Sequence, residues 1–280
     1  MSLPDQQQLR TLLSQLYQNP QHLERALAGL HSLGLHQTGA PPASDEHDID
    51  LLRRQRCGFP EVIYGEGKSA EQIIRIMEQL QDAQEDTLVT RLNPAAAASI
   101  MQRYPQCVHS ESGRTIRLMS MQEGNRDCGE VVVITAGSTD RAIADEACET
   151  LRWMRVPVTL LADAGVAGPH RLLQHLPRLQ QAAAIVCIAG MEAALPSVVG
   201  GYVACPVIGV PTSVGYGASL GGLTAMLSML TCCSSNVVCV NVDAGFKGGY
   251  TAGLIASRVS QTAPIRPFRS HPRLQGEEVF

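Results

Sequence analysis

Hydrophobic residues in the second half of the chain occur in five short, continuous runs, each followed by glycine or polar residues. Continuous apolar runs of this length are typical of strands that are buried on both faces of a sheet. A segment with helical spacing follows each run, so strands and helices alternate, which predicts a parallel, doubly wound α/β sheet. The five predicted strands span residues 130–137, 157–163, 183–190, 206–212 and 237–243.

The first half of the chain has a different pattern. Leucines at helical spacing predict a pair of short helices within residues 1–34. Further on, Ser69 predicts the start of a helix that ends near Gln84, because serine is a favoured residue at a helix amino terminus. Strands are predicted at residues 87–92 and 114–120, with a helix over 94–102 between them.

These patterns divide the chain into four segments. The last segment is rich in proline and polar residues, and we expect it to be disordered. The predicted division is a helical extension and linker (1–45), a small α/β module (46–127), a larger α/β domain (128–260) and a tail (261–280).

Residues 193–242 form a long segment without Asp, Glu, Lys, Arg or His. Prolines and paired glycines interrupt it, so no part approaches the roughly 20 unbroken apolar residues of a membrane-spanning helix. The helix predicted over residues 216–230 has no charged face to present to water. We therefore expect this helix to be buried against another subunit, and we expect no membrane association.

Charge and cysteine content narrow the class of protein. A net charge of −4 gives no reason to expect nucleic acid or an anionic membrane as a partner. The nine cysteines include no C-x-x-C pair, so neither a zinc site nor a thioredoxin-like site is supported. Free cysteines and the lack of a signal-peptide pattern predict a reducing, cytoplasmic environment.

Polar residues and glycines follow nearly every predicted strand of the larger domain. Ligands of doubly wound sheets bind beyond the carboxyl ends of the strands, so we expect these five loops to form a site. The candidate residues in these loops are Gly137, Ser138, Asp140, Asp163, His170, Glu192, Ser213, Gly215 and Tyr216.

Several of these residues have more than one interpretation. The Gly-Ser-Thr-Asp run favours binding of a phosphate by Ser138 and backbone N–H groups, or else ordinary helix capping. Glu192 is an acid/base candidate whose pKa burial would raise, and His170 is either catalytic or structural. No G-x-G-x-x-G follows the first strand and no Walker A motif is present, which disfavours the common dinucleotide-binding and ATP-binding folds.

Two further groups lie outside these loops. Arg53 and Arg56 share one face of any helix they form, and Lys68 follows a glycine-rich run, so these three cations favour either an anion site or a charged surface turn. Cys232 and Cys233 follow the charge-free helix, as buried hydrophobic residues or as reactive thiols.

Longer motifs resemble known families. The GSTD, IAGMEAALPSVVGG and CPVIGVPTSVGYGASLGGL segments resemble PurE-type aminoimidazole ribonucleotide mutases. A closer resemblance is to the LarB family, through D-x-x-R-x-x-R-x-G-x-P-E-V-x-x-G-E-G-K at residues 50–68, D-x-G-V-A-G-x-H-R at 163–171 and N-x-D-x-G-x-x-x-G-Y at 241–250. This resemblance covers roughly residues 50–258.

The resemblance implies a flavodoxin-like, PurE-type sheet and a specific reaction. LarB proteins convert nicotinic acid adenine dinucleotide and CO2 into pyridinium-3,5-biscarboxylate mononucleotide and AMP, for a nickel-pincer cofactor. The reaction passes through a cysteinyl adduct of the pyridinium ring, and the position of the family's cysteine corresponds to Cys233. A homo-octamer is expected by analogy with PurE, and Mg²⁺ is expected to assist phosphoanhydride cleavage.

The resemblance also distributes roles among the candidate residues. Glu192 or Asp140 is expected to handle the proton, and Ser138 to bind phosphate or carboxylate. The three cations Arg53, Arg56 and Lys68 are expected to contact anionic groups of the substrate. The alternatives are a PurE-like mutase that moves a carboxylate on an aminoimidazole ribonucleotide, or a nucleotide-binding module without catalysis.

Overall fold

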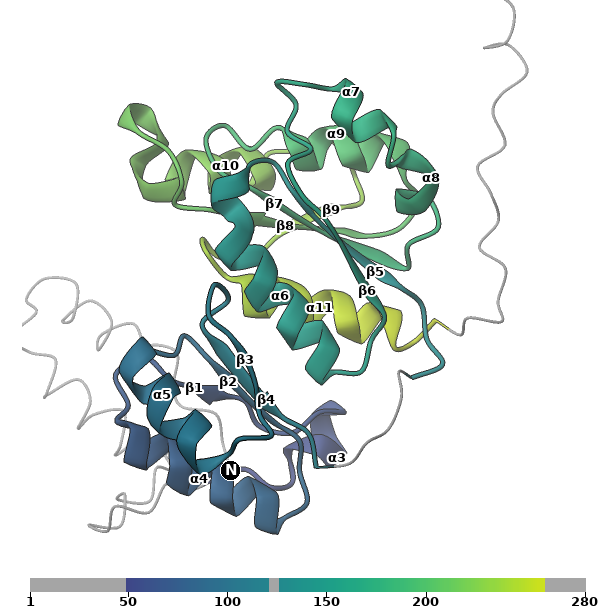
Figure 1. Ribbon diagram of the computed structural model, residues 1–280. Coiled ribbons are helices and arrows are strands. Elements are labelled where there is room, and N and C mark those ends of the chain that lie inside the picture. Colours follow the sequence, from purple (N-terminus) through teal and green to yellow (C-terminus); the bar gives the residue numbers. More distant parts are fainter. Residues whose placement is uncertain (1–48, 121–125, 260–280) are drawn as a thin grey trace, which may run out of the picture. The chain divides into compact units, whose positions relative to one another are not determined.

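A computed structural model describes residues 49–120 and 126–259, and the structural statements below concern these ranges. The predicted helical pair and the predicted tail lie outside them. The described ranges contain two sheets, one in each of the two predicted α/β regions (Figure 1). Within these ranges, no helix is long and apolar enough to span a membrane.

The amino-terminal sheet has four strands in the order β1-β2-β4-β3. Strands β1 and β2 are parallel, and the other two pairs are antiparallel. The strands are β1 (Ile63–Tyr64), β2 (Thr87–Thr90), β3 (Val108–Ser110) and β4 (Thr115–Leu118). The sequence pattern misses β1 and β3, because a two-residue strand and the short Val-His-Ser segment have no hydrophobic periodicity.

Helices α4 (Ala70–Asp82) and α5 (Pro94–Arg103) pack on this sheet, and the short α3 (Arg53–Cys57) precedes it. The predicted helix after Ser69 is confirmed, and it begins with reciprocal hydrogen bonds between Ser69 and Gln72. Its buried face carries Ile73, Met77 and Leu80 at helical spacing. This packing gives the amino-terminal module a hydrophobic core of its own.

The larger sheet has five parallel strands in the order β6-β5-β7-β8-β9, which confirms the predicted doubly wound α/β fold. The strands are β5 (Val131–Thr135), β6 (Val158–Leu161), β7 (Ala184–Ala189), β8 (Val207–Pro211) and β9 (Val237–Cys239). The chain moves outward from β5 to β6 and then returns to the other side of β5. The strand order therefore reverses between β5 and β7, where such sheets bind ligands.

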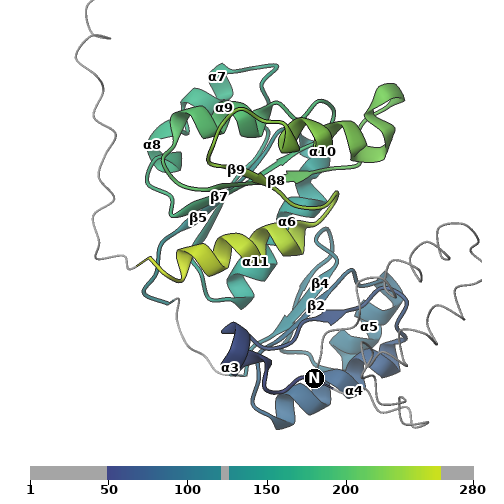
Figure 2. The same ribbon diagram turned by 180° about the vertical axis from the view of Figure 1, so that it is seen from behind.

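Helices cover both faces of this sheet (Figures 1 and 2). Successive side chains of a strand point to opposite faces, so Val131 and Val133 join one hydrophobic core while Val132 and Ile134 join the other. Helices α6 (Arg141–Trp153) and α11 (Gly245–Ala256) cover the first face. The other face carries α7 (His170–Leu173), α8 (Leu176–Leu179), α9 (Leu195–Tyr202) and α10 (Leu223–Leu230).

The helix predicted over residues 216–230 is wrong as a single element. A short 3₁₀ segment, η3 (Gly217–Gly222), precedes α10, and residues 220–222 have left-handed backbone angles that interrupt the helix. Gly222 comes so close to the sheet that a Cβ atom would lie 2.7 Å from the Thr212 carbonyl oxygen. The close approach and the positive φ both require glycine here.

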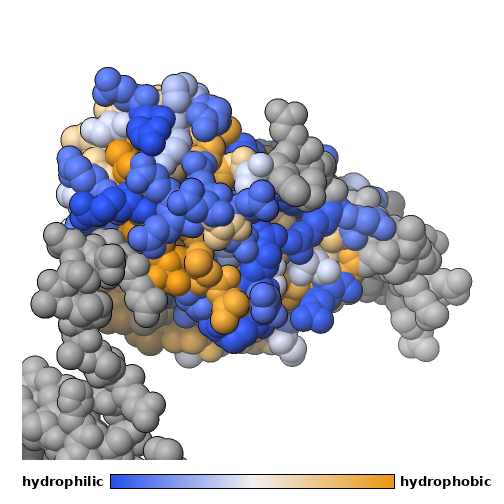
Figure 3. Space-filling view, turned by 90° about the horizontal axis from the view of Figure 1, so that it is seen from below, coloured by the Kyte–Doolittle hydropathy of each residue, from blue (hydrophilic) through white to orange (hydrophobic). Residues whose placement is uncertain are grey.

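The surface of the molecule mixes polar and apolar areas. In the face seen from below, hydrophobic residues gather in one area that hydrophilic residues border (Figure 3). Five exposed apolar side chains of the charge-free segment belong to η3, α10 and the residue before η3. They are Tyr216, Leu220, Leu223, Leu227 and Leu230.

Candidate active site

A cavity of about 310 Å³ lies at the carboxyl ends of the strands, where the strand order reverses. Its lining comes from the loops after β5, β6, β7 and β8, so four of the five predicted loops converge on it. The fifth loop, after β9, joins the loop after β8 through a hydrogen bond from the Ser213 N–H to the Asp243 carboxylate (2.8 Å). This is the arrangement that parallel strands produce, because their carboxyl ends share one edge.

Asp140 is the buried carboxylate of this cavity, with 2% of its surface exposed. It belongs to the 3₁₀ turn η2 (Ser138–Asp140) that precedes α6. The Gly137 N–H donates to one carboxylate oxygen (2.9 Å), and the Thr212 hydroxyl donates to the other (2.8 Å). Burial raises the pKa of Asp140, and these two hydrogen bonds oppose the rise. A carboxylate with a raised pKa and fixed orientation is suited to proton transfer.

Glu192 lies on the same cavity but is exposed. Its neighbours Met191 and Ala193 both have positive φ angles (55° and 51°). Their backbone is held by hydrogen bonds from the Met191 N–H to the Val214 carbonyl (3.0 Å) and from the Ala193 N–H to the Gly190 carbonyl (2.9 Å). Strained backbone that is fixed in this way is typical of functional loops.

Arg171 supplies a positive charge to the lining of the cavity. Its guanidinium pairs with the Asp163 carboxylate (2.6 Å), and the Asp163 N–H donates to the hydroxyl of Thr135 at the end of β5. Sequence reasoning selected Asp163 and His170 but missed Arg171, although the residue stands in the same D-x-G-V-A-G-x-H-R motif. It also missed Thr212, whose side chain is fully buried.

The other candidates of the strand-end loops lie near this cavity without lining it. Within the described residues, the lining includes Gly137, Asp140 and Glu192 but not Ser138, Asp163 or His170. Ser213, Gly215 and Tyr216, which follow Thr212 in the chain, are exposed and do not line the cavity. The structure therefore brings the two carboxylates, Asp140 and Glu192, to one cavity.

The two adjacent cysteines lie elsewhere in the same chain. Helix α10 runs from the strand-end loops back along the sheet, and Cys232 and Cys233 occupy the turn that leads to the start of β9. Asn236, in the same turn, donates to the Val203 and Cys205 carbonyls just before β8 (3.1 Å each). The cysteine turn is thus at the amino-terminal edge of the sheet. Within one described chain, neither thiol lines the cavity.

The environments of these cysteines differ. The Cys232 sulfur accepts hydrogen bonds from the Ser197 hydroxyl (2.9 Å) and the Ser234 N–H (3.4 Å). Partial burial acts to raise the pKa of Cys232, but hydrogen bonds from Ser197 and Ser234 outweigh it and lower the pKa. Cys233 is exposed. The first thiol is therefore tuned by its own chain, and the second is open to another molecule.

The predicted cations of the amino-terminal module also lie outside the cavity lining. Arg53 and Arg56 stand on α3, where Arg56 pairs with Asp50. The Lys68 ammonium donates to the Tyr64 carbonyl (2.8 Å) in the loop after β1. None of these three cations therefore contacts a ligand that lies wholly within the cavity of the same chain.

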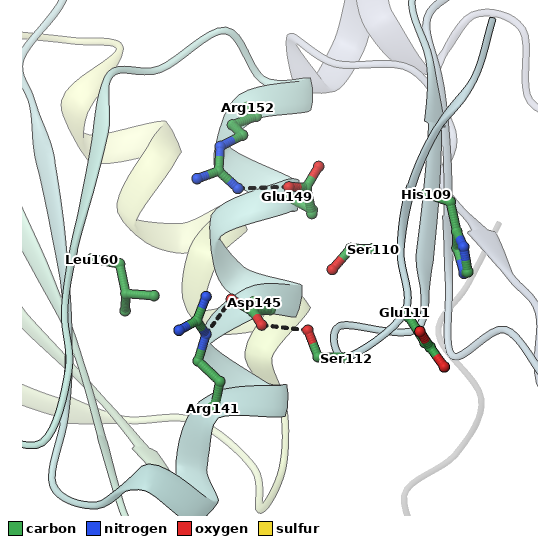
Figure 4. A pocket seen from close by; sticks show the side chains of 9 residues that line it. All are labelled: His109, Ser110, Glu111, Ser112, Arg141, Asp145, Glu149, Arg152 and Leu160. Atoms are coloured by element: carbon green, nitrogen blue, oxygen red, sulfur yellow. Dashed lines mark hydrogen bonds and ion pairs between the residues drawn. The ribbon is translucent and has the colours of Figure 1, made fainter.

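A second, open hollow of about 680 Å³ lies between α6 and the hairpin of β3 and β4 (Figure 4). Its charged side chains pair with one another, as Arg141 does with Asp145 (2.8 Å) and Arg152 with Glu149 (2.5 Å). Ser112 from the hairpin donates to Asp145 (Figure 4). These contacts already engage Arg141, Asp145, Glu149 and Arg152, and the Ser112–Asp145 bond links the hairpin to α6. Among the described residues, no three His, Cys, Asp or Glu side chains converge as a metal site.

The five-stranded sheet and the cavity at its reversal point define a flavodoxin-like α/β protein of the PurE type. Residues 130–265 match the model of the AIR carboxylase family, and residues 44–120 match that of the LarB/PurE-like N-terminal domain. The chain belongs to the LarB family, which joins these two domains, as the motifs predicted. The family supports a PurE-type carboxylase function for this chain.

Proteins similar to this chain cover different shares of it. An uncharacterised protein of Methanocaldococcus jannaschii is 37% identical over 216 residues, covering 74% of this chain and 83% of the relative. The solved structure of Treponema denticola PurE is 21% identical, with a TM-score of 0.36, and covers 46% of this chain and 78% of its own. A variant of PurE2 from the same organism is 22% identical, with a TM-score of 0.36, and covers 46% and 77%.

Proposed function

We propose that this protein carboxylates the pyridinium ring of nicotinic acid adenine dinucleotide and hydrolyses its phosphoanhydride, giving pyridinium-3,5-biscarboxylate mononucleotide and AMP. The observation that carries the proposal is the union of two domains. The first is an AIR carboxylase-type domain whose cavity holds a buried carboxylate of raised pKa, and the second is a LarB-type amino-terminal domain. The second domain favours a pyridinium dinucleotide over an aminoimidazole ribonucleotide as the proposed substrate.

The electron demand of the substrate explains why a thiol is required. A pyridinium ring is electron-poor and cannot attack CO2. Addition of the Cys233 thiolate forms a C–S bond and moves an electron pair to the ring nitrogen, giving a neutral dihydropyridine. Its enamine-like carbon then forms a C–C bond with CO2. Loss of the proton from that carbon and departure of the thiolate restore the aromatic ring, which is covalent catalysis by an activated nucleophile.

Asp140 is the side chain best suited to accept that proton. Its carboxylate is held by Gly137 and Thr212, and burial raises its pKa. Glu192, exposed on the same cavity, is the alternative proton acceptor. Arg171 and the Ser138 hydroxyl are proposed to bind anionic groups of the substrate.

Phosphoanhydride cleavage is proposed to use Mg²⁺, which binds through substrate phosphates and one or two carboxylates. The donors present fit such a substrate-held ion, because Glu192 is an exposed carboxylate on the cavity and the described residues hold no complete protein cage. The ion would neutralise phosphate charge during attack by water. Arg53, Arg56 and Lys68 are proposed to assist with the same charge.

A second copy of the chain is proposed to complete the site. The cysteine turn and the cavity lie at opposite edges of the sheet, so one chain does not bring its thiol to its own Asp140. The charge-free segment beside Cys233 leaves Leu227 and Leu230 half-exposed or more, and contacts between copies would bury them. These features support the expected homo-octamer, in which the thiol of one chain serves the cavity of another.

A comparison of two substrates tests which reaction the protein catalyses. The protein is incubated with bicarbonate, Mg²⁺ and either nicotinic acid adenine dinucleotide or aminoimidazole ribonucleotide, and products are separated by chromatography. We expect AMP and a doubly carboxylated pyridinium mononucleotide from the first substrate and no reaction with the second. Turnover of the imidazole substrate alone, or tight nucleotide binding without turnover, would contradict the proposal.

Mixing of impaired variants tests whether the site is shared. Cys233→Ala and Asp140→Asn proteins are each expected to be strongly impaired, whereas co-expressed mixed oligomers are expected to recover part of the wild-type activity. Recovery is expected because some cavities then combine an intact thiol from one chain with an intact carboxylate from another. Oligomers confirmed as mixed by mass spectrometry, yet still as impaired as the separate variants, would show that one chain supplies both groups.

A further inference from the structure

The amino-terminal module contacts the strand-end loops through Arg91, the first residue after β2. Arg91 has a left-handed backbone (φ 54°), which is uncommon for a residue with a side chain. Arg114 holds this backbone in place, because its guanidinium donates to the Arg91 carbonyl (3.1 Å) and to the Leu92 carbonyl (3.0 Å). The conformation is therefore maintained by specific contacts, as strained functional residues require.

The Arg91 guanidinium reaches two groups of the larger domain. It pairs with both carboxylate oxygens of Glu146 on α6 (2.9 and 3.3 Å), and it also donates to the Asp243 carbonyl. Glu146 is 2% exposed, and burial raises its pKa against the opposing charge of Arg91. The Gly245 and Phe246 N–H groups at the start of α11 also donate to Glu146. Arg91 thus holds the loop between β9 and α11 in two ways. It bonds the Asp243 carbonyl directly, and it pairs with Glu146, which accepts the N–H groups of Gly245 and Phe246.

That loop leads directly to the cavity. Asp243 has a left-handed backbone (φ 55°), its N–H donates to the Pro211 carbonyl (2.8 Å), and its carboxylate accepts the Ser213 N–H (2.8 Å). The next residue, Val214, lines the cavity and accepts the Met191 N–H, beside Glu192. A continuous series of hydrogen bonds therefore runs from the module to the cavity loops.

We propose that Arg91 is a positioning residue, which fixes Asp243 and through it the Ser213–Val214 loop over the cavity. The inference rests on the proposed function for the reaction it serves. Attachment of the module does not depend on Arg91, because Arg117 also pairs with Glu149 of α6 (2.6 Å) and Trp153 donates to the Asp86 carbonyl (3.1 Å). The bond to the Asp243 carbonyl is what sets Arg91 apart from Arg117.

Two substitutions separate positioning from attachment. Arg91→Met removes the contact with Asp243, and Arg117→Met is the matched control, because it removes a module-to-α6 ion pair while Arg152 still compensates Glu149. Hydrogen exchange of the full chain is followed at peptides that cover residues 212–216. We expect Arg91→Met to accelerate exchange there roughly 10-fold or more and the control to leave it unchanged.

The kinetics of carboxylation give the second readout. We expect Arg91→Met to lower kcat/KM for the dinucleotide roughly 10- to 100-fold, since a misplaced loop misaligns bound substrate. Arg117→Met is expected to keep the wild-type value. Arg91→Lys is expected not to restore it, because a lysine ammonium cannot replace a guanidinium that bonds two partners at once. Equal losses in Arg91→Met and Arg117→Met would overturn the proposal.

The double variant Arg91→Met with Glu146→Gln guards against simple unfolding, because it leaves no uncompensated buried charge. We expect it to recover stability but not the slow exchange of the Ser213 loop. Full recovery of that protection would show that Arg91 only neutralises Glu146, and would overturn the proposal. The exchange measurement needs no turnover, so it decides the role of Arg91 even if the wild-type protein fails to carboxylate the dinucleotide.

Discussion

Replacement of Cys233 by alanine is expected to reduce carboxylation by roughly 10⁴-fold or more, because removal of a covalent nucleophile eliminates the pathway that it opens. Without the thiolate, the ring keeps its positive charge and has no carbon able to attack CO2. Binding of the dinucleotide is expected to persist, since the cavity that contains Asp140 and Arg171 is formed by other loops. Product assays and calorimetric binding measured on the same preparation separate these effects.

The matched control is Cys232→Ala. Cys232 is half-buried and accepts hydrogen bonds from Ser197 and Ser234, so its hydrogen-bonded position suits a supporting role, whereas Cys233 is exposed. We expect the control to keep activity within a few-fold of wild type. Its lowered pKa makes Cys232 the direct competitor for the assignment. Loss of carboxylation activity in Cys232→Ala alone would assign the role of nucleophile to Cys232. Full activity in both variants would exclude a mechanism that uses either thiol.

Replacement of Asp140 by asparagine is expected to lower carboxylation roughly 10²- to 10⁴-fold, the range for loss of a general base. Asparagine preserves the size of the side chain but cannot accept the ring proton. Glu192→Gln is the matched comparison on the same cavity. A larger loss of activity in Glu192→Gln would assign the role of proton acceptor to Glu192. Steady-state kcat is the measurement, because this change acts on chemistry more than on binding.

The environment of Asp140 gives the reaction a pH dependence of defined sign. In the proposed mechanism Asp140 must be ionised to accept the proton, so activity is expected to rise with pH through its pKa. The Thr212 hydroxyl stabilises the ionised form, and its removal in Thr212→Val therefore raises that pKa further. We expect the acidic limb of the kcat profile to move to higher pH, because the ionised form loses one hydrogen bond. Thr212→Ser keeps the hydroxyl and is expected to leave the limb in place.

The sequence predicted the larger sheet well because its strands are buried on both faces and leave continuous apolar runs. Loop residues after such strands must share one edge, so the convergence of Gly137, Asp140 and Glu192 on the cavity followed from the pattern alone. The break before α10 was not predicted. A run without charged residues has no polar face, so its pattern does not show where the chain changes direction at Gly221 and Gly222.

Contacts between distant segments could not be predicted. Arg91 meets Glu146 and Asp243 across 55 and 152 residues of sequence, and no local periodicity encodes such a meeting. Residue type alone does not separate Arg171 from the neighbouring His170, because either side chain can bind an anion, and only the fold decides that Arg171 lines the cavity. The location of Cys233 follows from topology, since a helix that returns from the carboxyl edge must deliver the next turn to the opposite edge.

The central claim is that a thiol of this protein becomes covalently attached to a pyridinium ring during carboxylation. Intact-protein mass spectrometry after rapid quenching, with nicotinic acid adenine dinucleotide and isotopically labelled bicarbonate, tests it directly. The account predicts a transient adduct on the peptide that contains Cys232 and Cys233, and release of a mononucleotide that carries the label. A labelled product formed with no adduct on that peptide at any quench time, or an adduct that never leads to labelled product, would contradict it.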